Sequence, residues 1–320
     1  MVDIPRKRPK VSVIMNCLNC AKYLREAIDS IYAQTYKDWE IIFWDNASTD
    51  DSAVIAGNYD GRLRYFRDEE VVPLGKSRNL AMEKAGGEYI AFLDCDDKWM
   101  PEKLERQIPL FERNPLVGMV FSDAFDFFQY DGSSARHFLR HGFNPKRGKI
   151  FAHLLNEFSI SMPTVVLRAK ALYSQPEWFD ERFHICTDYD LFLRIAYDWE
   201  CDYVDEPLAV YRIHNASITE RLHQNISKER ALTIEKFYRL YPDIDSHYKK
   251  EIAKNKRIIA FQQGKSFWRE GKIADARESF KKHLYSPKVL LAYIATVFPY
   301  NSVMQVLNAV NRLSRTRMPE

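Results

Sequence analysis

Cysteine is scarce in this sequence. The five cysteines in 320 residues stand at positions 17, 20, 95, 186 and 201. An odd, scattered set does not supply the dense pairs that hold small secreted scaffolds together. Cys17 and Cys20 form a C-x-x-C pair, but no second pair follows at the spacing of a zinc site. We therefore expect a protein of a reducing compartment, without a disulfide framework.

Long apolar runs are also missing. The longest, Val289–Phe298, has about half the length that crosses a bilayer, and Pro299 follows it. The basic N-terminus is followed only by the short run Val11–Met15, so neither a signal peptide nor a spanning helix is expected. The expected location is the cytoplasm, with peripheral attachment to the inner face of the membrane left open.

The net charge is only +3, but the charges are unevenly distributed. Residues 219–320 carry 20 Lys and Arg against 10 Asp and Glu. Such a basic region attracts anionic partners such as lipid headgroups, although a solvated face without any partner fits as well. An apolar stripe in this region is compatible with a helix in a membrane interface or with a packed core helix: Val303, Val306, Leu307, Val310 and Leu313. No nucleic acid partner is expected.

Short apolar runs alternate with amphipathic segments over the first hundred residues, which indicates a doubly wound, mostly parallel α/β sheet flanked by helices. The expected strands are Val11–Met15, Glu40–Trp44, Leu63–Phe66, Tyr89–Leu93, Val117–Ser122, Thr164–Arg168 and Leu208–His214. The clearest expected helices are Ala21–Gln34, Ser77–Ala85, 101–113 and Asp188–Trp199. Between about 124 and 160 the pattern weakens, and we expect a loop-rich stretch that carries specificity. After residue 218 the composition becomes helical, and Gly264–Leu284 resembles one tetratricopeptide-type helix pair with Gly271 at its turn.

Polar residues follow three of the expected parallel strands. Asn19 follows the first, Asp45 the second, and Asp94 and Asp96 the fourth. Ligands of open parallel sheets bind beyond the carboxyl ends of the strands, so these residues predict a cleft there. Two carboxylates two residues apart can reach one hard cation, for which Mg²⁺ or Mn²⁺ is suited. The alternative for each Asp is capping or turn formation.

Four ordered segments make the prediction more specific. They are VSVIMNCLNCAKYLREAIDSIYAQTYKDWEIIFWDNASTDDS, GKSRNLAMEKAGGEYIAFLDCDD, TDYDLFLRIA and YRIHNASIT. Together, over residues 11–219, they resemble the family 2 glycosyltransferases of the GT-A fold. The resemblance implies an inverting, metal-dependent hexosyltransferase-type enzyme that moves a sugar from a nucleoside diphosphate donor to a hydroxyl acceptor. It divides the catalytic domain 1–218 into a nucleotide-sugar half, about 1–110, and an acceptor half, about 111–218. The basic helical region 219–320 would then associate with membrane or partner.

On the donor side, the resemblance implies roles for four residues. Asp45 matches the residue that accepts a hydrogen bond from uracil N3–H, which favours UDP or dTDP sugars over CMP sugars and does not exclude a guanine donor. Arg78 and Asn79 match the Arg-Asn pair near the nucleotide, with capping of its own helix as the alternative for Arg78. Asn19 is retained from the P-x-Y/F-N pattern, whose proline and aromatic residue are missing here.

For the metal and the chemistry, the resemblance points to the D-x-D and E-D motifs. Asp96 would bind the metal, and Asp94 would lie nearer the ribose. Asp188 would be the catalytic base, with a helix N-cap as its alternative; Thr187 stands where the family has an acidic residue, which puts acceptor preference in doubt. His214 would contact the metal or a phosphate, or serve only in the structure.

Two rival functions remain. A nucleotidyltransferase would need a Gly-rich phosphate loop near the N-terminus, and the sequence has none there. A catalytically silent module that binds sugar nucleotides or carbohydrate and recruits partners would not need a complete set of acidic residues. The sequence does not name the donor sugar, the acceptor or the linkage. Synthesis of a polysaccharide, capsule or lipopolysaccharide on a glycan or lipid-linked acceptor is expected from the family.

Overall fold

The structure is a computed structural model that describes residues 8–214, 217, 222 and 225–305. The chain divides into two compact units, Met1–Leu222 and His223–Glu320. The part of the predicted apolar stripe from Val306 to Leu313 lies outside the described residues.

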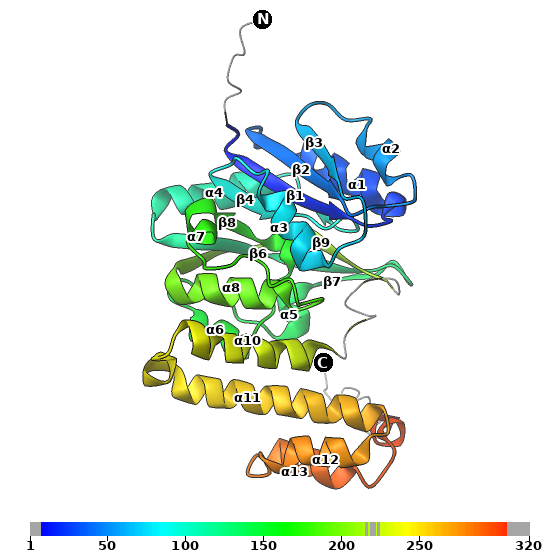
Figure 1. Cartoon of the computed structure of the whole chain (residues 1–320), viewed down its shortest axis with the longest axis vertical. Helices are drawn as coiled ribbons and strands as arrows, with labels where there is room; N and C mark the ends of the chain where they lie inside the picture. Colours follow the sequence, from blue (N-terminus) through cyan, green and yellow to red (C-terminus); the bar gives the residue numbers. More distant parts are fainter. Residues whose placement is uncertain (1–7, 215–216, 218–221, 223–224, 306–320) are drawn as a thin grey trace, which may run out of the picture. The chain divides into compact units, whose positions relative to one another are not determined.

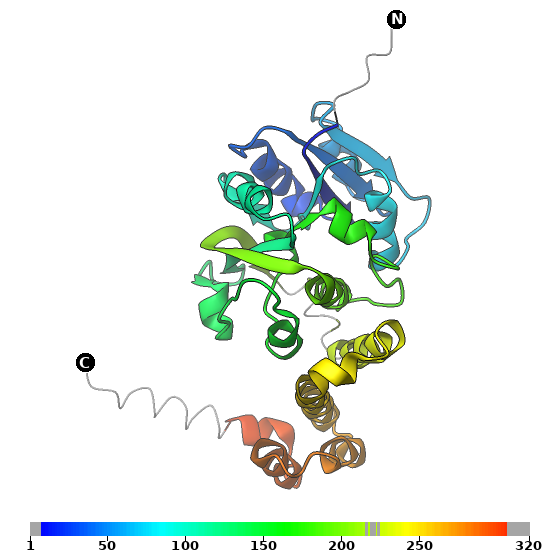
Figure 2. The same ribbon diagram turned by 90° about the vertical axis from the view of Figure 1, so that its left-hand side faces the viewer.

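One half of the sheet in the first unit consists of parallel strands. Its order is β3-β2-β1-β4 (Figure 1), with bounds β1 Val11–Cys17, β2 Trp39–Asp45, β3 Leu63–Arg67 and β4 Tyr89–Phe92. The connecting helices are α1 Ala21–Tyr32, α2 Ser52–Ala56 and α3 Leu74–Met82. Every side chain of β2 is buried, as expected of a strand covered on both faces. Helices lie on both sides of the sheet (Figures 1 and 2).

The other half of the sheet is mixed. It continues the order as β8-β6-β9-β5, with β7 paired to β6. The strands are β5 Lys98–Trp99, β6 Val117–Phe128, β7 Ser134–Arg136, β8 Val166–Arg168 and β9 Glu200–Ile213. The helices are α4 Lys103–Arg113, α5 His137–His141, α6 Phe151–Asn156, η1 Met162–Thr164, α7 Ala169–Tyr173 and α8 Thr187–Asp198. The predicted α/β class with a mostly parallel sheet is confirmed.

The loop-rich stretch expected between 124 and 160 is only partly present. β6 continues to Phe128 because it pairs in parallel with β9 along almost its whole length. β7 and the two short helices α5 and α6 then occupy much of the remainder. Pairing between strands distant in sequence overrides the weak local signal here.

The second unit is helical. Its helices are α10 Ile226–Leu240, α11 Ile244–Arg269, α12 Ile273–Lys281 and α13 Pro287–Ala295, and consecutive helices pack on one another (Figure 2). Gly271 adopts a φ of 78° between α11 and α12, which confirms the predicted helix pair. Among the described residues, no helix has the length and apolar character needed to cross a bilayer.

Candidate functional site

The polar strand ends predicted to converge lie at one edge of the sheet. Cys17 at the end of β1 pairs with Asp45 at the end of β2, and Ile14 of β1 pairs with Phe92 at the end of β4. All three strands are parallel, so the loops that follow them leave the sheet on the same side. Asn19, Asp45 and the acidic turn at 94–97 therefore begin from neighbouring positions.

Asp45 is fully buried and held by three donors. Its Oδ1 accepts a bond of 2.7 Å from the backbone N–H of Ser48. Its Oδ2 accepts one of 2.6 Å from the Tyr65 hydroxyl and one of 3.0 Å from Nη1 of Arg67. A carboxylate offers about four lone-pair positions, so one acceptor position remains. Burial, together with the bond to Asp45, raises the pKa of Tyr65, which therefore stays a donor at neutral pH.

Asn19 joins the loops that follow β1 and β2. Its backbone N–H donates to Oγ of Ser48 at 3.0 Å, and its Oδ1 accepts from the backbone N–H of Thr49 at 2.8 Å. Asn19 and Ala47 both adopt positive φ, 54° and 59°. Asn tolerates this conformation, whereas at Ala47 it stores strain of about 1–3 kcal/mol. The two loops are thus fixed against each other in a strained arrangement, a feature common at ligand sites.

Arg78 of α3 connects two segments far apart in the sequence. Its Nη2 donates to Oδ1 of Asp94 at 2.9 Å, and its Nη1 donates to Oγ1 of Thr187 at 2.8 Å. The Arg78 side chain is only 7% exposed, so solvent screens these bonds weakly. It does not cap its own helix surface. One guanidinium therefore fixes the loop after β4 relative to the start of α8.

Asn79, the next residue of α3, binds the backbone of the segment that precedes α8. Its Oδ1 accepts from the backbone N–H of Phe179 at 3.0 Å, and its Nδ2 donates to the Phe179 carbonyl at 3.0 Å.

The half-buried Asp188 lies in the first turn of α8, whose N-cap is Cys186, so the alternative N-cap role of Asp188 is wrong. Oδ1 of Asp188 accepts from the backbone N–H of Tyr189 at 2.7 Å.

The end of β9 holds the acidic turn from the other side. Nε2 of His214 lies 3.0 Å from Oδ2 of Asp96. The buried Arg212 donates through Nε to the Asp96 carbonyl at 2.8 Å and through its backbone N–H to Oδ1 of Asp97 at 2.8 Å. Its Nη2 also pairs with Glu26 at 2.7 Å. His214 and Arg212 thus both support the turn. His214 was expected to contact the metal or a phosphate, or to serve only in the structure, whereas no role was predicted for Arg212.

Two carboxyl groups of this turn, those of Asp96 and Asp97, have raised pKa values. Burial, and then the negative charge of Asp94, raises the pKa of Asp96 above its ordinary value. Burial and the neighbouring carboxylates raise the pKa of Asp97 further. A divalent cation would relieve this repulsion, and carboxylate oxygens suit Mg²⁺ or Mn²⁺. The closely spaced carboxylate oxygens of this turn therefore fit the predicted metal ion.

Sequence reasoning missed several contributors to this edge. Tyr65 and Arg67 are two residues apart on β3, so the alternation of a strand places them on one face, beside Asp45 of the adjacent strand. Arg212 lies within the Y-R-I-H segment, but nothing in the spacing distinguishes it from a surface arginine. The contact between Arg78 and Thr187 spans 109 residues and has no local signal.

Comparisons with known proteins agree with this geometry. The model of Glycosyl transferase family 2 matches residues 12–172. An uncharacterized glycosyltransferase of Methanocaldococcus jannaschii is 34% identical over 214 residues, which cover 65% of this chain and 72% of that protein.

Two solved structures share the fold. The crystal structure of S. aureus TarS 1-349 in complex with UDP-GlcNAc superposes with a TM-score of 0.58 at 19% identity, covering 81% of this chain and 72% of that one. The mannosyltransferase PcManGT from Pyrobaculum calidifontis, in complex with GDP-Man and Mn²⁺, has a TM-score of 0.60 at 18% identity, covering 94% and 84%.

Proposed function

Because the chain belongs to Glycosyl transferase family 2 and is a nucleotide-sugar-dependent glycosyltransferase, we propose that it transfers the sugar to an acceptor hydroxyl with inversion and with a divalent metal. The observation that carries this proposal is the pair of hydrogen bonds that Arg78 donates, one to Asp94 and one to Thr187. It joins the acidic turn to the helix start that bears Asp188. The loop that bears the proposed metal ligand Asp96 and the helix start that bears the proposed base Asp188 are thus linked through one guanidinium, which supports the fixed geometry that a direct displacement needs.

In this proposal Asp96 is the metal ligand, with Asp94 beside it and nearer the ribose. A bound Mn²⁺ or Mg²⁺ would neutralise charge on the departing nucleoside diphosphate. The contact of His214 with Asp96 favours a role in orienting that carboxylate over direct contact with phosphate. Arg212 keeps the turn fixed through the Asp96 carbonyl, so the carboxylates need little rearrangement when donor and metal bind.

Asp188 is the proposed base. It lies half-buried in the first turn of α8, where the bond from Tyr189 uses one of its carboxylate oxygens. It would take the acceptor proton while the hydroxyl attacks the anomeric carbon opposite the leaving diphosphate. General base catalysis contributes about 10²- to 10⁴-fold, so this residue accounts for a large part of the rate. Thr187 stands where the family has an acidic residue, and its hydroxyl accepts a hydrogen bond from Arg78. The acceptor side therefore has one carboxylate fewer.

We further propose a donor with uracil or thymine. The carboxylate of Asp45 can accept from the N3–H that both bases present, and because its side chain is fully buried, donor binding would have to open access to it. Ser48, Tyr65 and Arg67 would orient the carboxylate for it. TarS and PcManGT were crystallised with UDP-GlcNAc and GDP-Man, respectively, so the shared fold does not choose the base. Asp45 favours uracil and thymine over cytosine, whose N3 carries no hydrogen, but guanine also presents an N–H donor, so the nucleotide screen below decides between UDP or dTDP and GDP.

The acceptor is proposed to be a glycan or a lipid-linked intermediate in synthesis of a polysaccharide, capsule or lipopolysaccharide. Support comes from exposed apolar side chains on and after α13: Leu290, Leu291, Ile294, Val297 and Phe298. The exposed Lys281, Lys282 and Lys288 lie close by in sequence. Apolar residues beside cations suit the interface of an anionic membrane, with domain 1–218 as the catalytic part and 219–320 as the membrane-associating part.

Donor binding is tested by thermal shift with UDP, dTDP, GDP and CMP, each with and without Mn²⁺, because a ligand specific for the folded state raises the melting temperature. We expect stabilisation by UDP or dTDP that depends on Mn²⁺ and is lost in Asp45→Ala and Asp96→Ala. Glu102→Gln, at the exposed N-cap residue of α4, is the matched control and should respond as the wild type does. An equal response of all variants would contradict the assigned donor residues.

Membrane contact is tested separately by sedimentation with phosphatidylglycerol vesicles and with phosphatidylcholine vesicles. We expect binding to the anionic vesicles, and its loss in a Leu291→Gln, Phe298→Gln double variant because both side chains are more than half exposed. Undiminished binding of that variant would contradict the proposed surface.

A further inference from the structure

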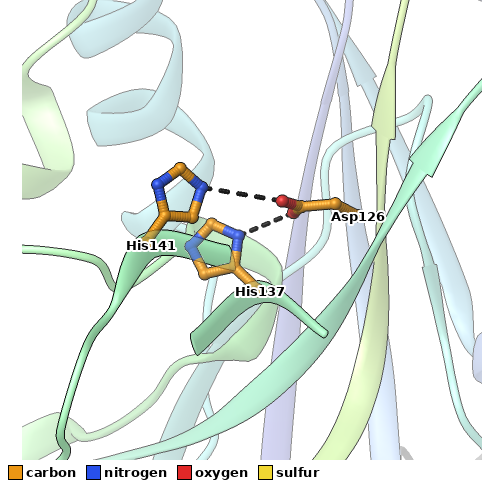
Figure 3. A group of neighbouring side chains, drawn as sticks. All are labelled: Asp126, His137 and His141. Atoms are coloured by element: carbon orange, nitrogen blue, oxygen red, sulfur yellow. Dashed lines mark hydrogen bonds and ion pairs between the residues drawn. The ribbon is translucent and has the colours of Figure 1, made fainter. Parts of the chain in front are cut away.

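A second cluster of metal-ligating side chains lies on β6 and α5. Asp126, His137 and His141 each offer one ligand atom, and these atoms all lie within 4.8 Å of one another. Figure 3 shows both imidazole rings directed at the carboxylate of Asp126. Within the part of the chain that the structure describes, no other group of three His, Cys, Asp or Glu meets this criterion. None of the three residues belongs to the proposed donor site.

The local fold explains why the three side chains meet. His137 and His141 are the first and last residues of α5, and a separation of four residues places them on one face of a helix. β6 and β7 are antiparallel neighbours in which Asp126 pairs with Ala135. This pairing brings the start of α5, two residues later, beside the carboxylate. Gly142, with a φ of 62°, ends the helix immediately after His141.

The three groups have the character of a transition-metal site. The Asp126 side chain is fully buried, with Oδ1 2.6 Å from Nδ1 of His137 and Oδ2 3.6 Å from Nε2 of His141. The other ring nitrogen of His137, Nε2, lies 3.2 Å from Oγ of Ser159. Metal-binding histidines characteristically use their second nitrogen for such an outer hydrogen bond, which fixes the ring. Two imidazoles and one carboxylate are ligands that Zn²⁺ accepts.

A cation already lies at this place. Nη1 of Arg140 is 2.5 Å from Oδ2 of Asp126 and 3.4 Å from Nε2 of His141. The guanidinium therefore neutralises a buried carboxylate that would otherwise be costly. The Arg140 side chain is 40% exposed and can turn into solvent without burying its charge. A metal ion at Asp126 would take over the neutralisation.

We propose that Asp126, His137 and His141 bind a divalent transition metal of the zinc class, which displaces the guanidinium of Arg140. Three protein ligands leave a fourth position for water or for an oxygen of a bound molecule. The metal would join α5 to β6. Asp126 pairs with Tyr211 of β9, and the next residue of β9, Arg212, holds the acidic turn of the donor site. The second metal would thus stabilise the strand pair on which that turn depends.

The test is Zn²⁺ binding by the whole protein, measured by competition with a chromophoric chelator and by elemental analysis after gel filtration. The Asp96→Asn variant serves as background because it weakens the other proposed metal site. In this background we expect one Zn²⁺ per chain. The His141→Ala change should weaken binding at least tenfold, because even the loss of an outer partner costs about 10- to 100-fold. His141 is 41% exposed at its side chain, so the variant should fold.

Two further variants make the test specific. Arg140→Gln removes the competing cation and should tighten Zn²⁺ binding, whereas unchanged affinity would overturn the displacement. His247→Ala, at an exposed histidine of α11, controls for weak surface binding and should bind as the background does. Absence of Zn²⁺ from the Asp96→Asn background, or equal affinities of His141→Ala and His247→Ala, would overturn the site itself. Neither result would bear on donor binding, which the nucleotide screen measures independently.

Discussion

Replacing Thr187 by Val tests the connection between the acidic turn and the helix that bears the proposed base. The change keeps the shape of the side chain and removes only the hydroxyl that accepts from Nη1 of Arg78 at 2.8 Å. Thr187 is 1% exposed and the Arg78 residue 6%, so water does not readily replace the lost acceptor. The bond of Arg78 to Asp94 remains.

The expected magnitude follows from the loss of one acceptor. A buried donor left without a partner costs about 1–3 kcal/mol, so the free energy of unfolding should fall by about that amount. Arg78 would also cease to fix the start of α8, and a displacement of about 1 Å at a catalytic group can cost about 10²-fold in rate. We therefore expect kcat to fall by about 10- to 100-fold. The affinity for the nucleotide should change little because Asp45 and Asp96 keep their contacts.

The assay combines chemical denaturation with steady-state kinetics for Thr187→Val and for Thr187→Ser, which keeps the hydroxyl. The Ser variant should retain most of both stability and kcat. Wild-type kcat and stability in Thr187→Val would refute the role given to the Arg78 connection.

Two further predictions concern stability. Burial lowers the pKa of Lys103 well below 10.5, so the unfolded chain binds that proton more tightly. The free energy of unfolding should therefore rise with pH between the folded and unfolded pKa values, and Lys103→Met should flatten this rise in denaturation curves measured at pH values below the unfolded pKa. In the helical unit, a Cβ on Gly264 would clash with the ring of Phe280, so Gly264→Ala should destabilise that unit by about 1–3 kcal/mol in thermal unfolding. Gly61→Ala, with nothing within 4 Å of the added Cβ, should not; equal effects would contradict the packing argument.

The sequence predicts the parallel half of the sheet well because its strands are short, apolar and separated by amphipathic helices. The convergence of Asp45 with Asp94 follows from that topology alone. The start of β9 was missed: residues 200–207 include four acidic residues and Pro207, and they form a strand because β6 pairs with them. The local sequence of residues 200–207 does not show that a distant strand will pair with them.

The supporting contacts of the site were less accessible to prediction. The spacing of His137 and His141 is visible in the sequence, but Asp126 joins them only through the β6–β7 pairing. The bond between Arg78 and Thr187 likewise depends on how α3 and α8 pack. Motifs therefore identify residues that contact ligands, whereas the side chains that hold them in place emerge only from the tertiary structure.

Sugar transfer by Asp188→Asn and Asp96→Asn, with the donor nucleotide chosen by the thermal-shift screen, tests the proposed base and the proposed metal ligand together. Both side chains keep their size, and only their charge and basicity change. We expect Asp188→Asn to bind nucleotide with Mn²⁺ but to lose at least about 10²-fold in turnover, and Asp96→Asn to lose both nucleotide binding with Mn²⁺ and turnover. Near-normal turnover in both variants would contradict the assignment of base and metal ligand.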